Sequence, residues 1–145
     1  MDPTTRAVLG VCMRWIHIAS VVTLLGGFIY ARLVLAPALA SLTGPDRDAF
    51  RKRTIAGFRP LLYTLMIFIL GSGAYNYVTK GRYPPHYHMW MGIKLLLVLH
   101  VFAAGILYAG RDADEAKTNR TLTGIVISGL IIIAIASYLR WISLA

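Results

Sequence analysis

The chain is poor in charged residues, and especially in negative ones. Of its 145 residues, 14% are Asp, Glu, Lys or Arg, and only six are Asp or Glu. A soluble domain of ordinary composition has about 25% charged residues. Hydrophobic residues make up 57% of the chain, and the mean hydropathy is +0.64. This composition excludes an ordinary water-soluble domain.

Cysteine is almost absent as well. Cys12 stands alone, so the chain cannot form an internal disulfide. The sequence has no Cys-x-x-Cys-His motif, and a haem in this protein would therefore not be attached covalently in the c-type manner. Alternating segments of about ten residues, which are typical of membrane β-barrels, are also missing. These absences leave α-helices as the way to cross a membrane.

Four long apolar segments dominate what is present. Each reaches the ~20 residues that an α-helix needs to cross ~30 Å of hydrocarbon. A helix that faces water on one side needs only one apolar face, and these segments are apolar all round. We therefore predict an all-α integral membrane protein, a single domain over 1–145 built as a four-helix up-down bundle. The expected helices are 8–36, 58–78, 89–109 and 121–143.

Proline and glycine mark the expected ends of these helices. Pro37 and the polar stretch 41–46 should end the first helix, because proline cannot continue it. Arg59-Pro60 should open the second helix, since proline suits a first turn.

The loop charges predict the orientation. In an up-down bundle the first and third loops share one face of the membrane. Nine cations lie on that face: Arg32, Arg47, Arg51, Lys52, Arg53, Arg59, Arg111, Lys117 and Arg120. Five lie on the other, or six with Lys94: Arg6, Arg14, Lys80, Arg82 and Arg140. The positive-inside rule then places both termini on the non-cytoplasmic side, in what we expect to be a bacterial inner membrane. These loops also explain the net charge of +9, so we expect membrane lipid as a partner and no nucleic acid.

Two histidines lie inside apolar segments, where ionisable groups are costly and usually functional. His17 comes nine residues after the start of the first segment, and His100 eleven after the start of the third. At ~1.5 Å per residue both lie roughly 15 Å deep. The first and third helices of such a bundle run parallel on opposite corners. We therefore predict that His17 and His100 are the axial ligands of one haem b iron. Structural hydrogen bonding, or a non-haem metal or proton site, are the alternatives.

The neighbours of both histidines fit a flat macrocycle. Ser20 lies close to the His17 face, and Ala103 and Ala104 lie close to the His100 face, at three- and four-residue spacing. Arg14 is one turn from His17 and could meet a haem propionate. The same small residues are also ordinary helix-packing devices in membranes. The arginine could equally extend to the lipid headgroups.

A second cluster lies at the start of the third segment. His86, His88, Met89 and Met91 carry imidazole and thioether groups, which copper favours. On the expected topology this cluster faces outward, as a copper site for metal acquisition would. Alternating aromatic and histidine residues at this position are also typical of an interfacial belt. Both interpretations remain open, as does a place at the rim of a haem or quinone pocket.

Several stretches resemble two related families of small membrane proteins. Residues 15–17 (WIH) and 26–33 (GGFIYARL) are similar to the first helix of the copper-resistance protein D (CopD) family and of the HemJ-type protoporphyrinogen oxidases. Residues 58–62 (FRPLL) and 71–75 (GSGAY) resemble the CopD-like second helix. Residues 92–99 (GIKLLLVL) resemble the third, where a lysine near the helix start is typical.

The resemblance implies a haem-binding four-helix scaffold. HemJ-type proteins are associated with haem b, and with a helix-one histidine and a helix-three lysine that matter for function. These match His17 and Lys94. Ala36-Pro37 departs from the HemJ pattern, which continues there with aromatic and histidine residues.

The leading interpretation is a membrane b-type cytochrome that holds haem b through His17 and His100, with Lys94 at the boundary. Two imidazoles leave no open iron position, which favours electron transfer with a quinone or a redox partner protein. The first alternative is an oxidoreductase using haem b, a HemJ-type protoporphyrinogen oxidase, for which Lys94 would matter. The second is a CopD-like copper permease. The sequence leaves a homo-oligomer open.

Overall fold

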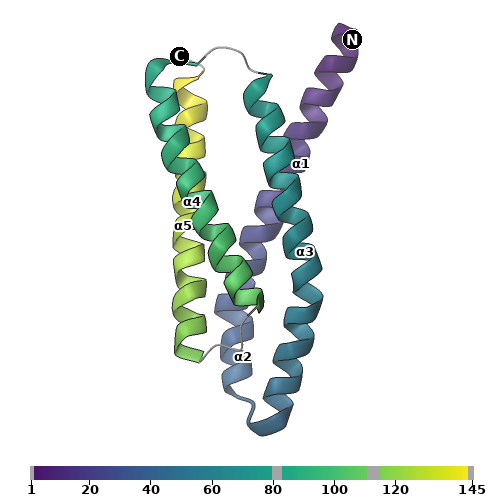
Figure 1. Cartoon of the computed structure of the whole chain (residues 1–145), viewed down its shortest axis with the longest axis vertical. Helices are drawn as coiled ribbons and strands as arrows, with labels where there is room; N and C mark the ends of the chain where they lie inside the picture. Colours follow the sequence, from purple (N-terminus) through teal and green to yellow (C-terminus); the bar gives the residue numbers. More distant parts are fainter. Residues whose placement is uncertain (1, 80–82, 111–114, 144–145) are drawn as a thin grey trace.

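The computed structural model describes residues 2–79, 83–110 and 115–143 and confirms the all-α membrane architecture (Figure 1). All four helical units are long and apolar enough to cross a membrane. The protein is therefore an integral membrane protein. The first unit consists of α1 (Pro3–Tyr30), a π-helical segment η1 (Ala31–Leu35) and α2 (Ala36–Ala40). The other three are α3 (Gly44–Val78), α4 (Pro85–Gly110) and α5 (Glu115–Ile142).

The first helical unit continues past Pro37, where it was expected to end. Pro37 has no N–H and cannot bond to the carbonyl one turn before it. The preceding turn widens instead, and the N–H of Ala36 donates to the carbonyl of Ala31, five residues back. The π-helical segment thus accommodates the proline, and the helix ends only after Ala40.

The expectation that Arg59-Pro60 opens the second helix is wrong, because α3 already begins at Gly44. Gly44 has a φ of +64°, a value that suits glycine, and Pro45 occupies the first turn. Pro60 lies inside α3 and costs it only one main-chain hydrogen bond. The early start adds residues 44–57 to the helix, and we call this segment, which contains Arg47, Arg51, Lys52 and Arg53, the cationic extension of α3.

The four units pack as two pairs. The most extensive contacts join α1 to α3 and α4 to α5, whereas α1–α5 and α3–α4 contacts are fewer. Helices α1 and α4 therefore occupy opposite corners. Both termini lie at one end of the bundle (Figure 1). The two pairs diverge toward that end and converge near the middle (Figure 1).

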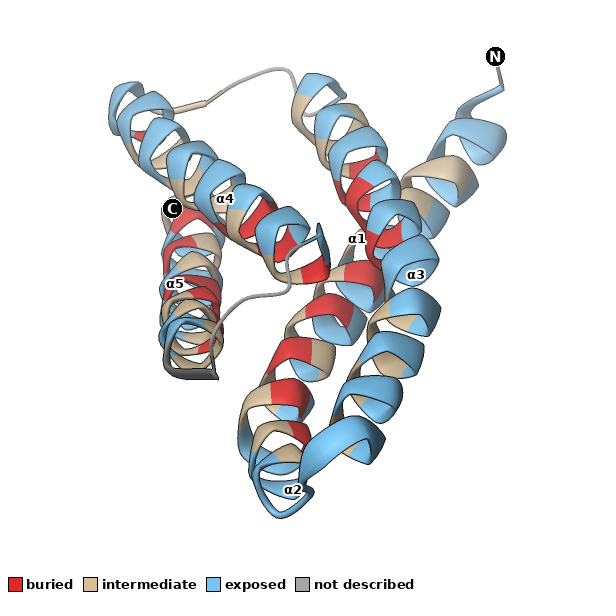
Figure 2. Cartoon of the chain, turned by 60° about the horizontal axis from the view of Figure 1, so that its bottom comes forward, coloured by how far each residue is buried: buried red, intermediate tan, exposed pale blue. Residues whose placement is uncertain are grey.

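The main core lies in the half away from the termini. Buried side chains on the facing sides of all four helices form it (Figure 2). Phe28 is fully buried at its centre, with edge-to-face contacts to Phe58 and Tyr108 at centroid distances of 5.6 and 6.2 Å. Gly105 allows this packing, because an added Cβ would lie 3.0 Å from Phe28 Cζ. This core holds the two helix pairs together, and a smaller cluster around Tyr87, Ile135 and Leu139 lies in the half near the termini.

Candidate functional site

Three polar side chains extend the core-facing stripes of their helices toward the termini. His17 precedes buried Ser20, Leu24 and Phe28 by three, seven and eleven residues, so it lies on their face of α1. Ser72 lies on the buried face of α3 and is itself buried. Lys94 precedes buried Val101 and Gly105 by seven and eleven residues on α4. We call His17, Ser72 and Lys94 the polar triad.

A hydrogen-bond chain orients His17. Its Nδ1 lies 3.0 Å from Ser72 Oγ. The Ser72 hydroxyl has one proton, and that proton is donated to the Phe68 carbonyl. The serine oxygen must then accept from His17 Nδ1–H, so we assign the tautomer with the lone pair on Nε2. The carbonyl of Ile69 is a further acceptor near the ring. A histidine fixed through one nitrogen, with a lone pair on the other, is suited to bind a metal.

Gly73 gives the imidazole its place against α3. A Cβ at Gly73 would lie 3.1 Å from His17 Cε1 and 3.5 Å from its Nδ1. Any larger residue would push the ring away and lengthen the bond to Ser72. One turn further, Asn76 Nδ2 donates to the Met13 carbonyl at 3.5 Å and joins the same two helices. Neither Ser72 nor Gly73 was identified from the sequence. The one signal for them was a serine between two glycines in an apolar helix.

Lys94 comes from the opposite helix pair to meet this site. The side chain is partly buried and lies on the same face of α4 as Val101 and Gly105. The sequence had suggested a boundary position for Lys94. The structure places it on the inner stripe of α4, nine residues after the helix begins at Pro85.

The structure does not bring His100 to His17. His100 is exposed and lies outside the buried stripe of α4. It follows Lys94 by six residues, which is about 120° around the helix at 3.6 residues per turn. Because Lys94 occupies the inner stripe, His100 must face outward. The two histidines are on diagonal helices as expected, but only His17 points inward.

The other residues expected around the haem also differ in whether they face the interior. Ser20 is buried beside His17 on α1, whereas Arg14 is exposed. Ala104 packs against the main core. Ala103 is exposed on the outer side of α4 with His100. Ser20 and Ala104 thus contribute to the interior, whereas Arg14 and Ala103 do not.

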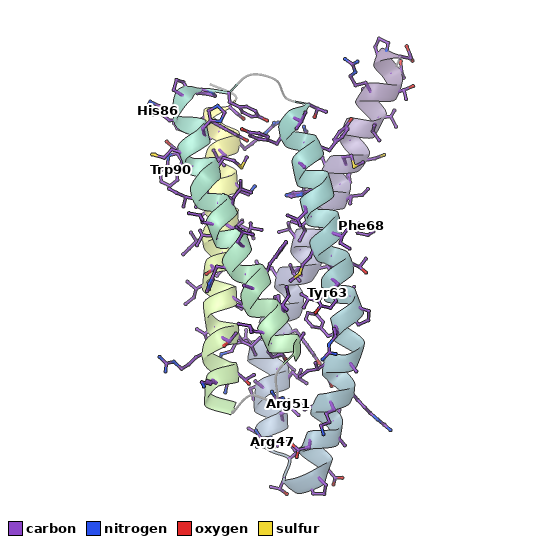
Figure 3. All side chains as sticks on the ribbon, in the orientation of Figure 1. Arg47, Arg51, Tyr63, Phe68, His86 and Trp90 are labelled. Carbon is purple, nitrogen blue, oxygen red and sulfur yellow. The ribbon has the colours of Figure 1, made fainter. Side chains whose placement is uncertain are left out.

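The expected copper ligands form two separate pairs. On a helix, residues three apart share a face and residues two apart do not. His86 therefore pairs with Met89, and His88 with Met91. His86 points away from the bundle (Figure 3). His88 Nδ1 lies 3.2 Å from the Tyr77 hydroxyl. Within the described residues, no three His, Cys, Asp or Glu side chains gather as a metal-binding group.

An aromatic cluster joins α3 to α4 near the termini, and sequence reasoning did not find it. Tyr83 stacks between Tyr77 and Tyr87 at centroid distances of 5.0 and 4.1 Å. Its hydroxyl donates to the Tyr77 carbonyl at 2.5 Å. Burial, and then the neighbouring Tyr77, raise the pKa of Tyr83 above its ordinary value. The sequence placed Tyr87 in a possible interfacial belt, and the stacking of Tyr77, Tyr83 and Tyr87 becomes visible only in the folded structure.

The geometry therefore presents one inward imidazole with a free lone pair and one inward ammonium from the facing helix pair. An imidazole lone pair can bind a metal ion, and an ammonium can pair with a carboxylate. Comparison of the chain with protein-family models, with curated proteins and with solved structures finds no match.

Proposed function

We propose that the protein is a membrane oxidoreductase that binds haem b, with His17 as an axial ligand and Lys94 as the anchor for a carboxylate. The observation that carries this proposal is the polar triad. It combines a lone pair on His17 Nε2 with a lysine facing it from the other helix pair. When bound, haem b supplies one-electron exchange at its iron. His17 would hold the haem, and Lys94 would neutralise the charge of a carboxylate beside it.

The distribution of acidic residues supports the role of Lys94. An ammonium inside a membrane span is costly and calls for an anionic partner. The six Asp and Glu residues lie at positions 2, 46, 48, 112, 114 and 115, so no span has an acidic residue in its apolar part. A haem propionate or a substrate carboxylate would supply the missing charge. Lysine suits this role because its ammonium is a compact point charge on a flexible stem.

Among haem oxidoreductases, the triad favours the HemJ-type alternative. The resemblance to that family matches a histidine at 17 and a lysine at 94, and these are the two residues that face inward together. The substrate would be a porphyrinogen, a tetrapyrrole that carries carboxylate side chains. Lys94 would hold one of these carboxylates while His17 holds the haem.

A b-type cytochrome that exchanges electrons with a quinone is the second candidate. The hydrogen-bonded Tyr77–His88 pair favours it, because the imidazole can accept a proton that a quinol releases and the phenol can pass a proton to it. This pair lies at the end of α3, five residues after Ser72. In this candidate His17 keeps its role, and the quinone would bind beside the aromatic cluster.

The orientation belongs to the proposal as well. We propose that the cationic end, with the first and third loops, faces the cytoplasm of a bacterial cell. Both termini and the aromatic cluster would then lie on the outer side of the inner membrane. Arg47 and Arg51 lie at the end of the bundle that this proposal assigns to the cytoplasm (Figure 3).

An absorption spectrum of the detergent-purified protein tests the haem proposal. Protein from haem-replete cells should carry about one haem b per chain. A single protein imidazole on the iron should give a spectrum with high-spin character, in contrast to the low-spin spectrum of two imidazoles. A colourless preparation would refute the proposal. A fully low-spin spectrum in both redox states would indicate that His100 or another strong ligand occupies the second axial position.

A further inference from the structure

The cationic extension of α3 forms one wall of a pocket at the end opposite to the termini. The pocket has a volume of about 240 Å³ and lies between α3 and the last residues of α4. Arg51, Lys52 and Arg59 line it together with small or apolar residues: Ile55, Ala56, Ala109 and Gly110. No acidic residue is among these lining residues. Within the described part of the chain, three cationic side chains therefore line this small open space.

The arrangement of these side chains is fixed by local structure. Lys52 and Arg59 are seven residues apart, which puts them on one side of α3, two turns from each other. The small side chain of Ala56 lies between them and leaves room. Gly110 also lines the pocket, and a Cβ added to it would meet no other atom within 4 Å.

Arg59 is held in place by the end of α4. Its Nε and Nη2 both donate to the Ala109 carbonyl, at 3.2 and 2.6 Å. This carbonyl belongs to the negative end of the helix dipole, which favours a guanidinium there. Arginine has five N–H donors, and this contact uses two of them. The guanidinium is therefore already positioned and retains donors for an anion.

We propose that this pocket binds the phosphate group of an anionic phospholipid headgroup. It lies where α3 passes from its cationic extension into its apolar part, which is the level of the headgroups. Basic pockets between membrane helices are suited to anionic headgroups, because guanidinium and ammonium groups form charge-assisted hydrogen bonds to phosphate. The inference is independent of the proposed haem function, since none of the polar triad lines the pocket.

Lipid binding to the full-length protein tests the proposal. The protein is purified in detergent, stripped of co-purified lipid, and titrated with phosphatidylglycerol, phosphatidylcholine or inorganic phosphate at constant ionic strength. Native mass spectrometry counts bound lipid, and the melting temperature reports binding of all three. Phosphatidylglycerol should bind and raise the melting temperature, and phosphatidylcholine should bind much more weakly. Equal binding of both lipids would overturn the proposal.

Neighbouring cations of α3 provide a matched control. Lys52→Gln should weaken phosphatidylglycerol binding at least about tenfold, because it removes a charged hydrogen-bond donor. Arg53→Gln removes the same charge one residue later, where the exposed side chain does not line the pocket, and should bind like the wild type. Equal losses in both variants would show diffuse attraction to the membrane and would refute a specific pocket.

Filling the pocket without changing its charge is the second control. Ala56→Leu should reduce phosphatidylglycerol binding while the melting temperature of the lipid-free protein stays close to that of the wild type. Unchanged binding would place the lipid elsewhere and overturn the proposal. Inorganic phosphate that binds alone and competes with the lipid would support a phosphate site but reject a lipid as its natural occupant.

Discussion

Lys94 of α4 and His17 of α1 both lie on the core-facing stripes of their helices, and these helices occupy opposite corners of the bundle. Each residue precedes buried residues of its own helix by seven and eleven positions, and this spacing puts it on the buried face. The pair gives the interior one metal-binding nitrogen and one positive charge.

Replacing the two intramembrane histidines should have unequal effects. His17→Ala removes the inward ligand and should reduce haem content to background. His100→Ala changes an exposed side chain and should leave haem content and the visible spectrum unchanged. Haem per chain, from a pyridine haemochrome assay on purified protein, measures both. Loss of haem in both variants would instead support the paired-histidine ligation expected from the sequence.

Ser72→Ala should weaken haem binding without removing the ligand. The change deletes the acceptor of the His17 Nδ1–H bond and frees the ring to rotate. Loss of such a supporting bond typically costs 10–100-fold in metal affinity, so we expect about that decrease in haem affinity. Ser128→Ala, at another buried serine on α5, is the control and should bind haem normally. Haem transfer to apomyoglobin measures the difference, and equal retention in both variants would remove Ser72 from the site.

Lys94→Met should abolish activity toward a carboxylate-bearing substrate. Rescue of a bacterial strain that lacks protoporphyrinogen oxidase is the assay. The wild type should rescue growth, Lys94→Met should not, and Lys94→Arg should rescue partly because it keeps the charge but not the shape of the ammonium. The haem content of each purified variant is also measured, because an inactive variant that retains haem has lost substrate binding and not the cofactor. A wild type that fails to rescue would favour the electron-carrier candidate.

Gly105→Ala should destabilise the bundle. The added Cβ would lie 3.0 Å from the Cζ of Phe28, which is fully buried and has little room to move. Overpacking of this kind costs typically about 1–3 kcal/mol. Gly92→Ala, on the same helix with nothing within 4 Å, should be neutral or slightly stabilising. Melting temperatures in one detergent compare the two, and equal values would mean that the core relaxes around the methyl group.

Reporter fusions test the orientation. Fusions after the C-terminus and in the loop at 84–85 should report the non-cytoplasmic side, because their end of the bundle has fewer cations. A fusion near Asp46 should report the cytoplasm. Alkaline phosphatase and green fluorescent protein give opposite signals on the two sides and control for expression. The reversed pattern would put the phosphate pocket outside and the aromatic cluster inside.

The sequence by itself determined the architecture. Apolar segments of this length have few alternatives in a membrane, because every main-chain polar group must be bonded within its own helix. The four spans and the diagonal placement of the first and third helices follow from their number and order. The helix ends were less predictable. Helix α3 begins at Gly44-Pro45 and not at Arg59-Pro60, and a π-helical segment allows the first helix to continue through Pro37.

Only the tertiary structure decided which polar residues form the site. The sequence places Lys94 and His100 about 120° apart on one helix, so both cannot face inward, but it does not say which one does. Packing of Gly105 and Val101 against the core turns Lys94 in and His100 out. Ser72 meets His17 across 55 positions of sequence, a contact that no local pattern encodes. Spacing gives the angle between two side chains, whereas the direction of the interior depends on which helices pack together.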